Sequence, residues 1–345
     1  MKKLVAALLV GTMVFSLTAC GSSSSTSEDT STTEDTTEET TEDASEEETT
    51  EDATADSDSK GIIAYSCYNM GWEYYVTLSQ GVQDAAEAAG YEYVNVDQES
   101  DQSKMIQQCT DLINQGIACL VLTPCKPEAV SSIYEAAEKA GVPVVLADIG
   151  TDEQGYMALL KSDNYDGGCM AGDYVVEKFG ENGGKFATIT VDPSNTNIVR
   201  TDGFADVMKE AGWEEAASLA GNSEPDEAYS CMQDILTANP DVKVVFCGND
   251  PMAISAAQAV ADAGLTPGED VYVIGYDAQS NVFEPIENGE VLATVAQDPY
   301  GMGSGAVEVF LNSLDGEEPE FDDADTKLIY TDQWIIDADN AADYE

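Results

Sequence analysis

Short polar side chains stand directly after several apolar runs of strand length in this chain. They are carboxylates and amides, which accept hydrogen bonds, and the amides also donate them. In an open parallel sheet, ligands bind outside the carboxyl ends of the strands. Any one of these residues could instead cap the next helix, but capping alone does not explain why several separate strands end this way. The candidate ligand contacts are Asn69, Asp148, Asn249, Asp277 and Gln297.

Arg200, in the segment NIVRTDGF, is the only arginine, and every other basic residue is a lysine. A guanidinium offers five donors in a rigid planar fork and stays charged, which lysine cannot reproduce. The alternative is a surface ion pair worth ~0–1 kcal/mol. Lysine would serve that purpose equally well, so we expect Arg200 to donate to a ligand beside carboxylates such as Asp148 or Asp277.

The segment YNMGWEYY places aromatic rings beside the first strand end, at Tyr68, Trp72, Tyr74 and Tyr75. Rings against the apolar faces of a sugar, together with groups that donate and accept hydrogen bonds, suit a neutral polyol. The alternative is that Tyr74 and Tyr75 begin a helix and that one of them packs in the core.

Composition excludes several other functions. The 345 residues include 67 acidic and 13 basic side chains and no histidine, for a formal net charge of -54. Nucleic acids and anionic membrane surfaces both require clustered positive charge. The lack of histidine removes the usual participant in Ser-His-Asp catalysis and in most zinc sites. We expect no metal and no cofactor, and the acidity itself favours solubility.

The start of the chain resembles an export signal. Lys2 and Lys3 precede an apolar run that is too short for an ordinary membrane-spanning helix, and the segment LTAC ends at Cys20. Because Leu-Thr-Ala-Cys resembles a bacterial lipobox, residues 1–19 are predicted to be a signal peptide and Cys20 to carry lipid. Residues 20–59 are then the lipidated cysteine and a disordered linker, since a segment rich in Ser, Thr, Asp and Glu cannot bury enough surface to fold.

Seven further cysteines follow, at 67, 109, 119, 125, 169, 231 and 247. An odd number in an exported chain leaves at least one of them unpaired. Most lie in apolar patterns, which favours small buried side chains, although a disulfide between some of them stays open.

From Gly61 onward, apolar runs of strand length alternate with helical stretches that end at glycines, as in βαβ units. Asp250 and Pro251 read as a helix cap followed by a first-turn proline. One sheet holding all these strands would be unusually wide. The sequence therefore predicts an α/β protein with two doubly wound parallel-sheet lobes.

Residues from about 60 to 315 resemble the ribose-type (type I) periplasmic sugar-binding proteins of bacterial ABC importers. The resemblance is carried by YYVTLSQG, PVVLAD, SDNYDGGCMAGDYV, VRTDGF, MQDILTANPDVKVVFCGNDPMAISAAQA, VIGYDA and ATVAQDPYGMG. It implies sugar contacts at Asn69, Tyr74, Tyr75, Asp148, Arg200, Asn249, Asp277 and Gln297.

The chain also departs from the ribose binders. Ile149 stands where they have a second arginine, an aromatic residue is replaced near Ser223, and a longer aromatic loop brings in Trp72. These departures put ribose itself in doubt and favour another sugar or polyol.

The resemblance further implies two lobes joined by a hinge, with residues 60–162 plus 298–325 in the first lobe and 163–297 plus 326–345 in the second. A ligand that contacts both lobes would favour a closed state. The expected function is capture of a monosaccharide or related polyol by a monomer held outside the cytoplasm by its lipid anchor alone, and delivery to an ABC permease.

Two alternatives remain open. One is a sugar sensor that presents its ligand to a membrane receptor. The other is a glycosidase that uses Asp148 and Asp277 as acid and base. We expect Arg200 to lower the pKa of such aspartates, which would disfavour a general acid.

Overall fold

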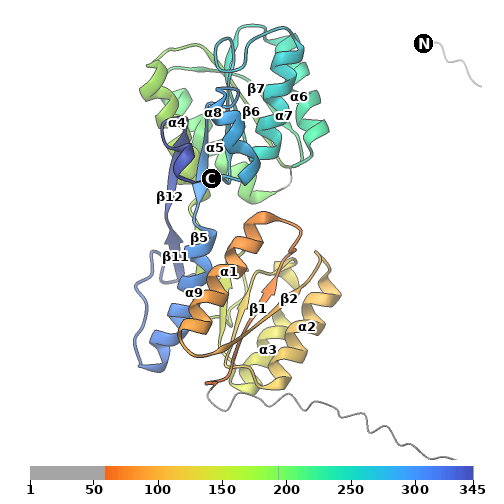
Figure 1. Cartoon of the computed structure of the whole chain (residues 1–345), viewed down its shortest axis with the longest axis vertical. Helices are drawn as coiled ribbons and strands as arrows, with labels where there is room; N and C mark the ends of the chain where they lie inside the picture. Colours follow the sequence, from red (N-terminus) through yellow and green to blue (C-terminus); the bar gives the residue numbers. More distant parts are fainter. Residues whose placement is uncertain (1–58, 193, 345) are drawn as a thin grey trace, which may run out of the picture. The chain divides into compact units, whose positions relative to one another are not determined.

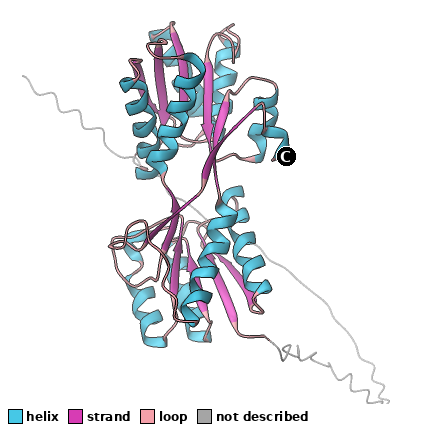
Figure 2. Ribbon diagram, turned by 90° about the vertical axis from the view of Figure 1, so that its left-hand side faces the viewer, coloured by secondary structure: helices cyan, strands magenta, loops and turns pink. Residues whose placement is uncertain are grey.

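The computed structural model describes residues 59–192 and 194–344, which belong to one compact unit. They form two lobes, each a six-stranded sheet with helices on both faces (Figures 1 and 2). The predicted signal peptide, Cys20 and nearly all of the predicted linker lie outside the described residues. Within the described part of the chain, no helix is both long enough and apolar enough to cross a membrane.

The first lobe is built on a wholly parallel sheet with strand order β11-β5-β4-β3-β1-β2. Its strands are β1 Ile62–Cys67, β2 Glu92–Asp97, β3 Cys119–Leu122, β4 Val144–Ala147, β5 Leu159–Ser162 and β11 Leu328–Thr331. Its helices are α1 Glu73–Ala88, α2 Gln102–Gln115, the 3₁₀ turn η1 Pro127–Ala129, α3 Ser131–Ala140 and α9 Pro299–Leu314.

The second lobe repeats this arrangement with strand order β12-β10-β9-β8-β6-β7, and only the edge strand β12 runs antiparallel. Its strands are β6 Lys185–Thr190, β7 Glu214–Ala220, β8 Val242–Cys247, β9 Tyr272–Tyr276, β10 Ala293–Gln297 and β12 Gln333–Asp337. Its helices are α4 Asn164–Phe179, α5 Asn195–Glu210, α6 Pro225–Ala238, α7 Asp250–Asp262, η2 Ser280–Val282, α8 Phe283–Glu287 and η3 Ala341–Asp343.

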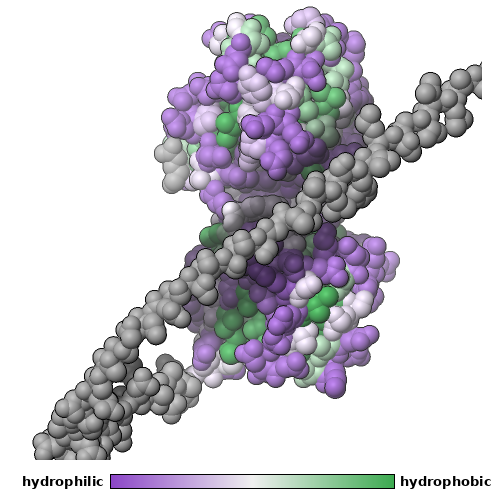
Figure 3. Space-filling model, turned by 90° about the vertical axis from the view of Figure 1, so that its right-hand side faces the viewer, coloured by the Kyte–Doolittle hydropathy of each residue, from purple (hydrophilic) through white to green (hydrophobic). Residues whose placement is uncertain are grey.

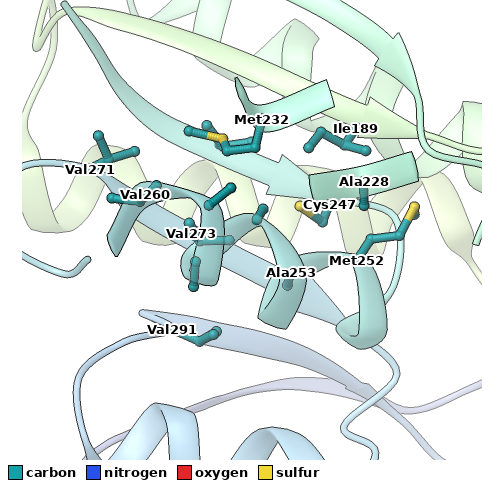
Figure 4. Close-up of a cluster of buried hydrophobic side chains, with 14 of the residues drawn as sticks. Ile189, Ala228, Met232, Cys247, Met252, Ala253, Val260, Val271, Val273 and Val291 are labelled. Carbon is teal, nitrogen blue, oxygen red and sulfur yellow. The ribbon is translucent and has the colours of Figure 1, made fainter. Parts of the chain in front are cut away.

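Each sheet is buried on both faces because successive side chains of a strand point to opposite sides. In β1, Ile63 and Tyr65 join the core under α1 and α9, whereas Ala64 joins the core under α2 and α3. The second lobe has the same two-sided core. Figure 4 shows its α6–α7 side, where Met232 and Met252 pack with strand residues. The outer surface is mainly hydrophilic on the face drawn in Figure 3, in keeping with the charge of the chain.

The chain passes between the two sheets three times, from β5 to α4, from β10 to α9 and from β11 to β12. The predicted assignment of residues 326–345 to the second lobe is therefore wrong for its first strand. β11 pairs in parallel with β5 of the first sheet, and only β12 pairs with β10 of the second. In the sequence, β11 and β12 look like one apolar segment. They belong to different sheets because each pairs with a strand far away in the chain.

All seven body cysteines have free thiols, so no disulfide links them in the described part of the chain. Five are buried, and Cys169 and Cys231 are half-buried. They act as small apolar side chains, as the sequence pattern predicted.

Candidate functional site

Asp148 and Asp277 directly follow β4 and β9, and both have a left-handed backbone. Their φ angles are 66° and 101°, a region that residues other than glycine seldom occupy. The sheets hold them there, because Asp148 N–H donates to the Leu160 carbonyl over 2.7 Å and Asp277 N–H donates to the Val295 carbonyl over 2.8 Å. Backbone strain that is maintained in this way gathers at functional sites. One carboxylate is thus fixed at the carboxyl edge of each sheet.

A fully buried carboxylate holds the turn that follows Asp277. Asp250 Oδ2 accepts from Gln279 N–H over 2.8 Å, and its Oδ1 accepts from the Thr294 hydroxyl over 2.6 Å. The Thr294 hydroxyl in turn accepts from Ala278 N–H over 3.3 Å. Burial raises the pKa of Asp250 well above its ordinary value. The backbone N–H groups of Ala278 and Gln279, in the strained turn, therefore both have hydrogen-bond acceptors.

Asn249, rather than Asp250, is the cap of α7, so the predicted capping role of Asp250 is wrong. Asn249 Oδ1 accepts from Met252 N–H over 3.1 Å, and its Nδ2 donates to Ser223 Oγ over 2.9 Å. Asn249 therefore serves both as a helix cap and as a cavity residue, two roles that the sequence had treated as alternatives.

Arg200, on α5, is 5% exposed and is held from several sides. Its Nε donates to Asn164 Oδ1 over 2.7 Å, and its Nη1 donates to the Gly248 carbonyl over 2.9 Å and lies 3.1 Å from Asp277 Oδ1. The guanidinium carbon lies 3.8 Å from the centre of the Tyr276 ring. Burial opposes the positive charge, but Asp277 and Tyr276 outweigh it and the pKa of Arg200 is raised. Nη2 makes no hydrogen bond with the residues that the structure describes, so its N–H groups are free for a ligand.

Polar contacts connect the two lobes at the site, and the single hydroxyl proton of Tyr74 serves one of its two acceptors at a time. The Tyr75 hydroxyl donates to Asp148 Oδ2 over 2.9 Å, and the Tyr74 hydroxyl lies 3.3 Å from Asp148 Oδ1. The same Tyr74 hydroxyl lies 3.5 Å from Gln297 Oε1, and Gln297 Nε2 donates to Asp277 Oδ1 over 2.6 Å. Asp277 in turn pairs with the guanidinium, so the polar groups of both lobes form one network.

These groups open onto a cavity of about 790 Å³, a size typical of sites for small molecules. Both lobes contribute to its wall. The predicted residues that line it are Trp72, Tyr74, Tyr75, Asp148, Arg200, Asn249, Asp277 and Gln297.

Asn69 is the predicted contact that does not line this cavity. Its Nδ2 donates to Ser100 Oγ over 3.0 Å, and its Oδ1 accepts from Gly71 N–H over 2.8 Å. Its side chain therefore shapes the loop that precedes α1, and the structure gives it no ligand-facing role.

Three aromatic rings pack together on the cavity wall and are called the aromatic group here: Tyr68, Trp72 and Tyr75. Their ring centroids lie 5.4–5.9 Å apart with interplanar angles of 10–23°. Tyr75 is 5% exposed and Trp72 is 54% exposed. The group therefore runs from the interior of the first lobe to solvent.

Some site residues were not predicted. Glu73, Glu224 and Gln279 line the cavity, and Asn164 orients Arg200. A signal existed for Asn164, because it follows a strand end, as the predicted contacts do. Glu73 lies within the aromatic segment itself, but nothing in the sequence showed which way it points.

The comparisons with known proteins agree with this geometry. A family model described as a periplasmic binding protein domain matches residues 63–318. The ribose import binding protein of Salmonella typhimurium is 30% identical over 260 residues, which are 75% of this chain and 87% of that protein. This chain belongs to the ribose-type periplasmic binding protein family. The predicted family and fold class are confirmed.

Solved structures share the fold of this periplasmic binding protein. An ABC transporter solute-binding protein from Actinobacillus succinogenes, solved with bound D-allose, is 25% identical with a TM-score of 0.73 and covers 83% of this chain and 100% of its own. The periplasmic ribose ABC transporter structure from Conexibacter woesei has a TM-score of 0.76 at 23% identity and covers 83% and 94% of the two chains. At 23% identity, the similarity to the Conexibacter woesei structure shows a shared fold and nothing more.

Members of the family are transport components, so this periplasmic binding protein is not an enzyme. The expected pKa argument against a glycosidase was nevertheless wrong. Burial raises the pKa of Asp148 and of Asp277 above the ordinary aspartate value, although Arg200 acts in the opposite direction on both. The family, and not the ionisation of these groups, decides against catalysis.

Proposed function

We propose that this protein captures a monosaccharide or related polyol in the cavity between its lobes and delivers it to the permease of an ABC importer. The observation that carries the proposal is the network that runs from Asp148 through Tyr74 and Gln297 to Asp277 and Arg200. It offers donors and acceptors together, as hydroxyl groups require. Relatives named for ribose, D-apiose and D-allose import or binding support a small sugar.

Ligand capture can signal occupancy only if the ligand favours one arrangement of the lobes. A sugar between Asp148 of the first lobe and Arg200 of the second would contact both and so favour closure. We expect the loaded form to be the one that the permease recognises, and we expect the protein to act as a monomer.

Export and anchoring complete the proposal. The segment that ends in LTAC supports cleavage before Cys20 and lipid attachment to that residue, which would hold the protein outside the cytoplasm on the membrane. The wild type should incorporate a labelled fatty acid, and Cys20→Ala should not. If the variant still takes up the label, Cys20 is not the site of lipid attachment.

A thermal-shift screen of pentoses, hexoses, deoxysugars and cyclitols tests the binding function. A ligand that binds only the folded state raises the unfolding midpoint by mass action. The proposal requires that at least one compound of these classes, or its amino derivative, raises the midpoint of the wild type, and that at the same concentration it raises the midpoint of Arg200→Lys by less. If neither these compounds nor their amino derivatives raise the midpoint, the proposal is overturned.

A further inference from the structure

The charges that line the ligand cavity do not balance. Four acidic residues line its wall, Glu73, Asp148, Glu224 and Asp277, against the single arginine Arg200, and the Glu73 carboxylate accepts hydrogen bonds from Ser280. When these groups are ionised, the cavity carries net negative charge. A cleft lined by one sign of charge concentrates its field and attracts the opposite charge.

The one cation is already engaged. Arg200 pairs with Asp277, and its Nε and Nη1 donate to Asn164 and to the Gly248 carbonyl. Its remaining N–H groups can bind a hydroxyl, but its charge is already matched by a carboxylate.

Asp148 has no such partner. Its oxygens receive the Tyr74 and Tyr75 hydroxyls, and no lysine or arginine forms an ion pair with it in the described chain. Ile149, the next residue, adds an apolar side chain to the cavity wall. A partly buried carboxylate without a cationic partner is costly, and a cation brought by the ligand would remove that cost.

The aromatic group lies beside this carboxylate, since Tyr75 belongs to the group and donates to Asp148. Aromatic faces attract ammonium groups electrostatically. The same faces cover the apolar side of a sugar ring. A carboxylate beside aromatic faces therefore suits a ring that carries an ammonium group.

We propose that the ligand of this cavity is a sugar or cyclitol that bears a protonated amine, with the ammonium placed against Asp148 and the aromatic group. The inference rests on the proposed function and narrows its ligand class. Neutral sugars of the same shape bind more weakly. Sugars with a carboxylate or phosphate are rejected, because like charges across an interface oppose binding.

Matched ligand sets test the charge directly. Calorimetry with the full chain would compare glucose, glucosamine, N-acetylglucosamine and glucuronate, then the galactose equivalents, and then myo-inositol with an aminocyclitol. In at least one set the amine should bind about tenfold tighter than its hydroxyl parent. The N-acetyl form keeps the nitrogen without its charge and should lose this advantage, and the uronate should not bind.

Variants locate the effect. Asp148→Asn should remove most of the amine's advantage, whereas the control Asp241→Asn should keep it, because Asp241 is exposed and pairs with Lys185 on the surface. If Asp148→Asn does not fold, Glu224→Gln replaces it. That side chain is exposed on the cavity wall, and its loss should lower the advantage about threefold.

The outcomes separate the two proposals. If neutral sugars bind and no amine binds more tightly than its parent, the charge inference is overturned and the binding function stands. The charge inference is also overturned, and the binding function also stands, if a uronate binds as tightly as its neutral parent sugar. If no member of any set binds, the proposed function fails and this inference fails with it.

Discussion

Arg200 and Asp277 form an ion pair, with Nη1 3.1 Å from Oδ1, at the wall of the ligand cavity. Arg200 reaches this position from α5, and Asp277 reaches it from the end of β9. Contacts of Arg200 with Asn164 and the Tyr276 ring fix the guanidinium before a ligand arrives. Groups that are already ordered lose less entropy on binding, so this pair is a preorganised half of the site.

Arg200→Lys should lower sugar affinity by about tenfold, or ~1.4 kcal/mol. An ammonium can keep the charge near Asp277, but it has neither the second arm of the fork nor the flat face that stacks on Tyr276. Titration calorimetry with a sugar identified by the thermal screen measures the change. The control is Lys185→Arg at an ion pair with Asp241 outside the cavity, which should leave affinity unchanged. Equal affinity of Arg200→Lys and wild type would remove Arg200 from the site.

Thr294→Val should weaken both folding and ligand binding. Valine has nearly the same shape but leaves Asp250 Oδ1 and Ala278 N–H without the partner they share, at a cost of about 1–3 kcal/mol of unfolding free energy. The turn after Asp277 then loses its support, so affinity should also fall. Denaturant unfolding and calorimetry measure the two effects.

Thr188→Val provides a matched control for this effect. Thr188 is 1% exposed and donates to Ser218 Oγ over 2.9 Å, but it does not line the cavity. We expect it to lose stability and to keep its affinity. If both threonine variants weaken binding equally, the loss reflects general destabilisation and not the Asp277 turn.

Local signals allowed much of the fold to be predicted. Glycines end α2 and α3 at Gly116 and Gly141, with φ angles of 80° and 71°, because only a residue without a Cβ adopts this conformation at no cost. Strand-end polar residues were predicted to converge because parallel strands share a carboxyl edge. Both rules need only the neighbouring sequence.

Features that depend on distant parts of the chain were not predictable. β11 joins the first sheet through pairing with β5, more than a hundred and fifty residues earlier. Asn69 has the residue type and position of a contact, yet Ser100 and Gly71 turn it into a loop residue. Gly168 belongs to one of the motifs that carry the resemblance, but the sequence does not show why glycine is required there. The structure does, because α5 crosses so closely that a Cβ on residue 168 would collide with the Arg200 carbonyl.

As the pH is lowered, ligand affinity should begin to fall above the ordinary titration range of aspartate. Burial raises the pKa of Asp148 and of Asp277, so they take up protons above the pH at which exposed aspartates do. A protonated carboxyl accepts hydroxyl hydrogen bonds less well, which lowers affinity. Calorimetry from neutral pH down to this range checks the prediction, and a flat profile would contradict it.

The stability of the unliganded protein should change in the opposite direction. Folding raises these two pKa values. At a pH between the pKa of the unfolded state and that of the folded state, the folded protein therefore binds more protons than the unfolded protein. Their contribution to stability is therefore present below the unfolded pKa and is lost as the pH rises through the folded pKa. Asp148→Asn should reduce this slope in a series of denaturant titrations at different pH values.

Ligand binding should change the tryptophan fluorescence through Trp72. Its ring lines the cavity, is 54% exposed and stacks on Tyr68, so a bound sugar alters its solvation. Trp72→Phe keeps an aromatic ring there and should remove most of the signal while changing affinity only a few-fold. Trp213→Phe is the control, because Trp213 is 3% exposed and donates to the Gly180 carbonyl away from the cavity. A full signal in Trp72→Phe would mean that another tryptophan reports binding, and Trp72 would then have no place in the ligand contact.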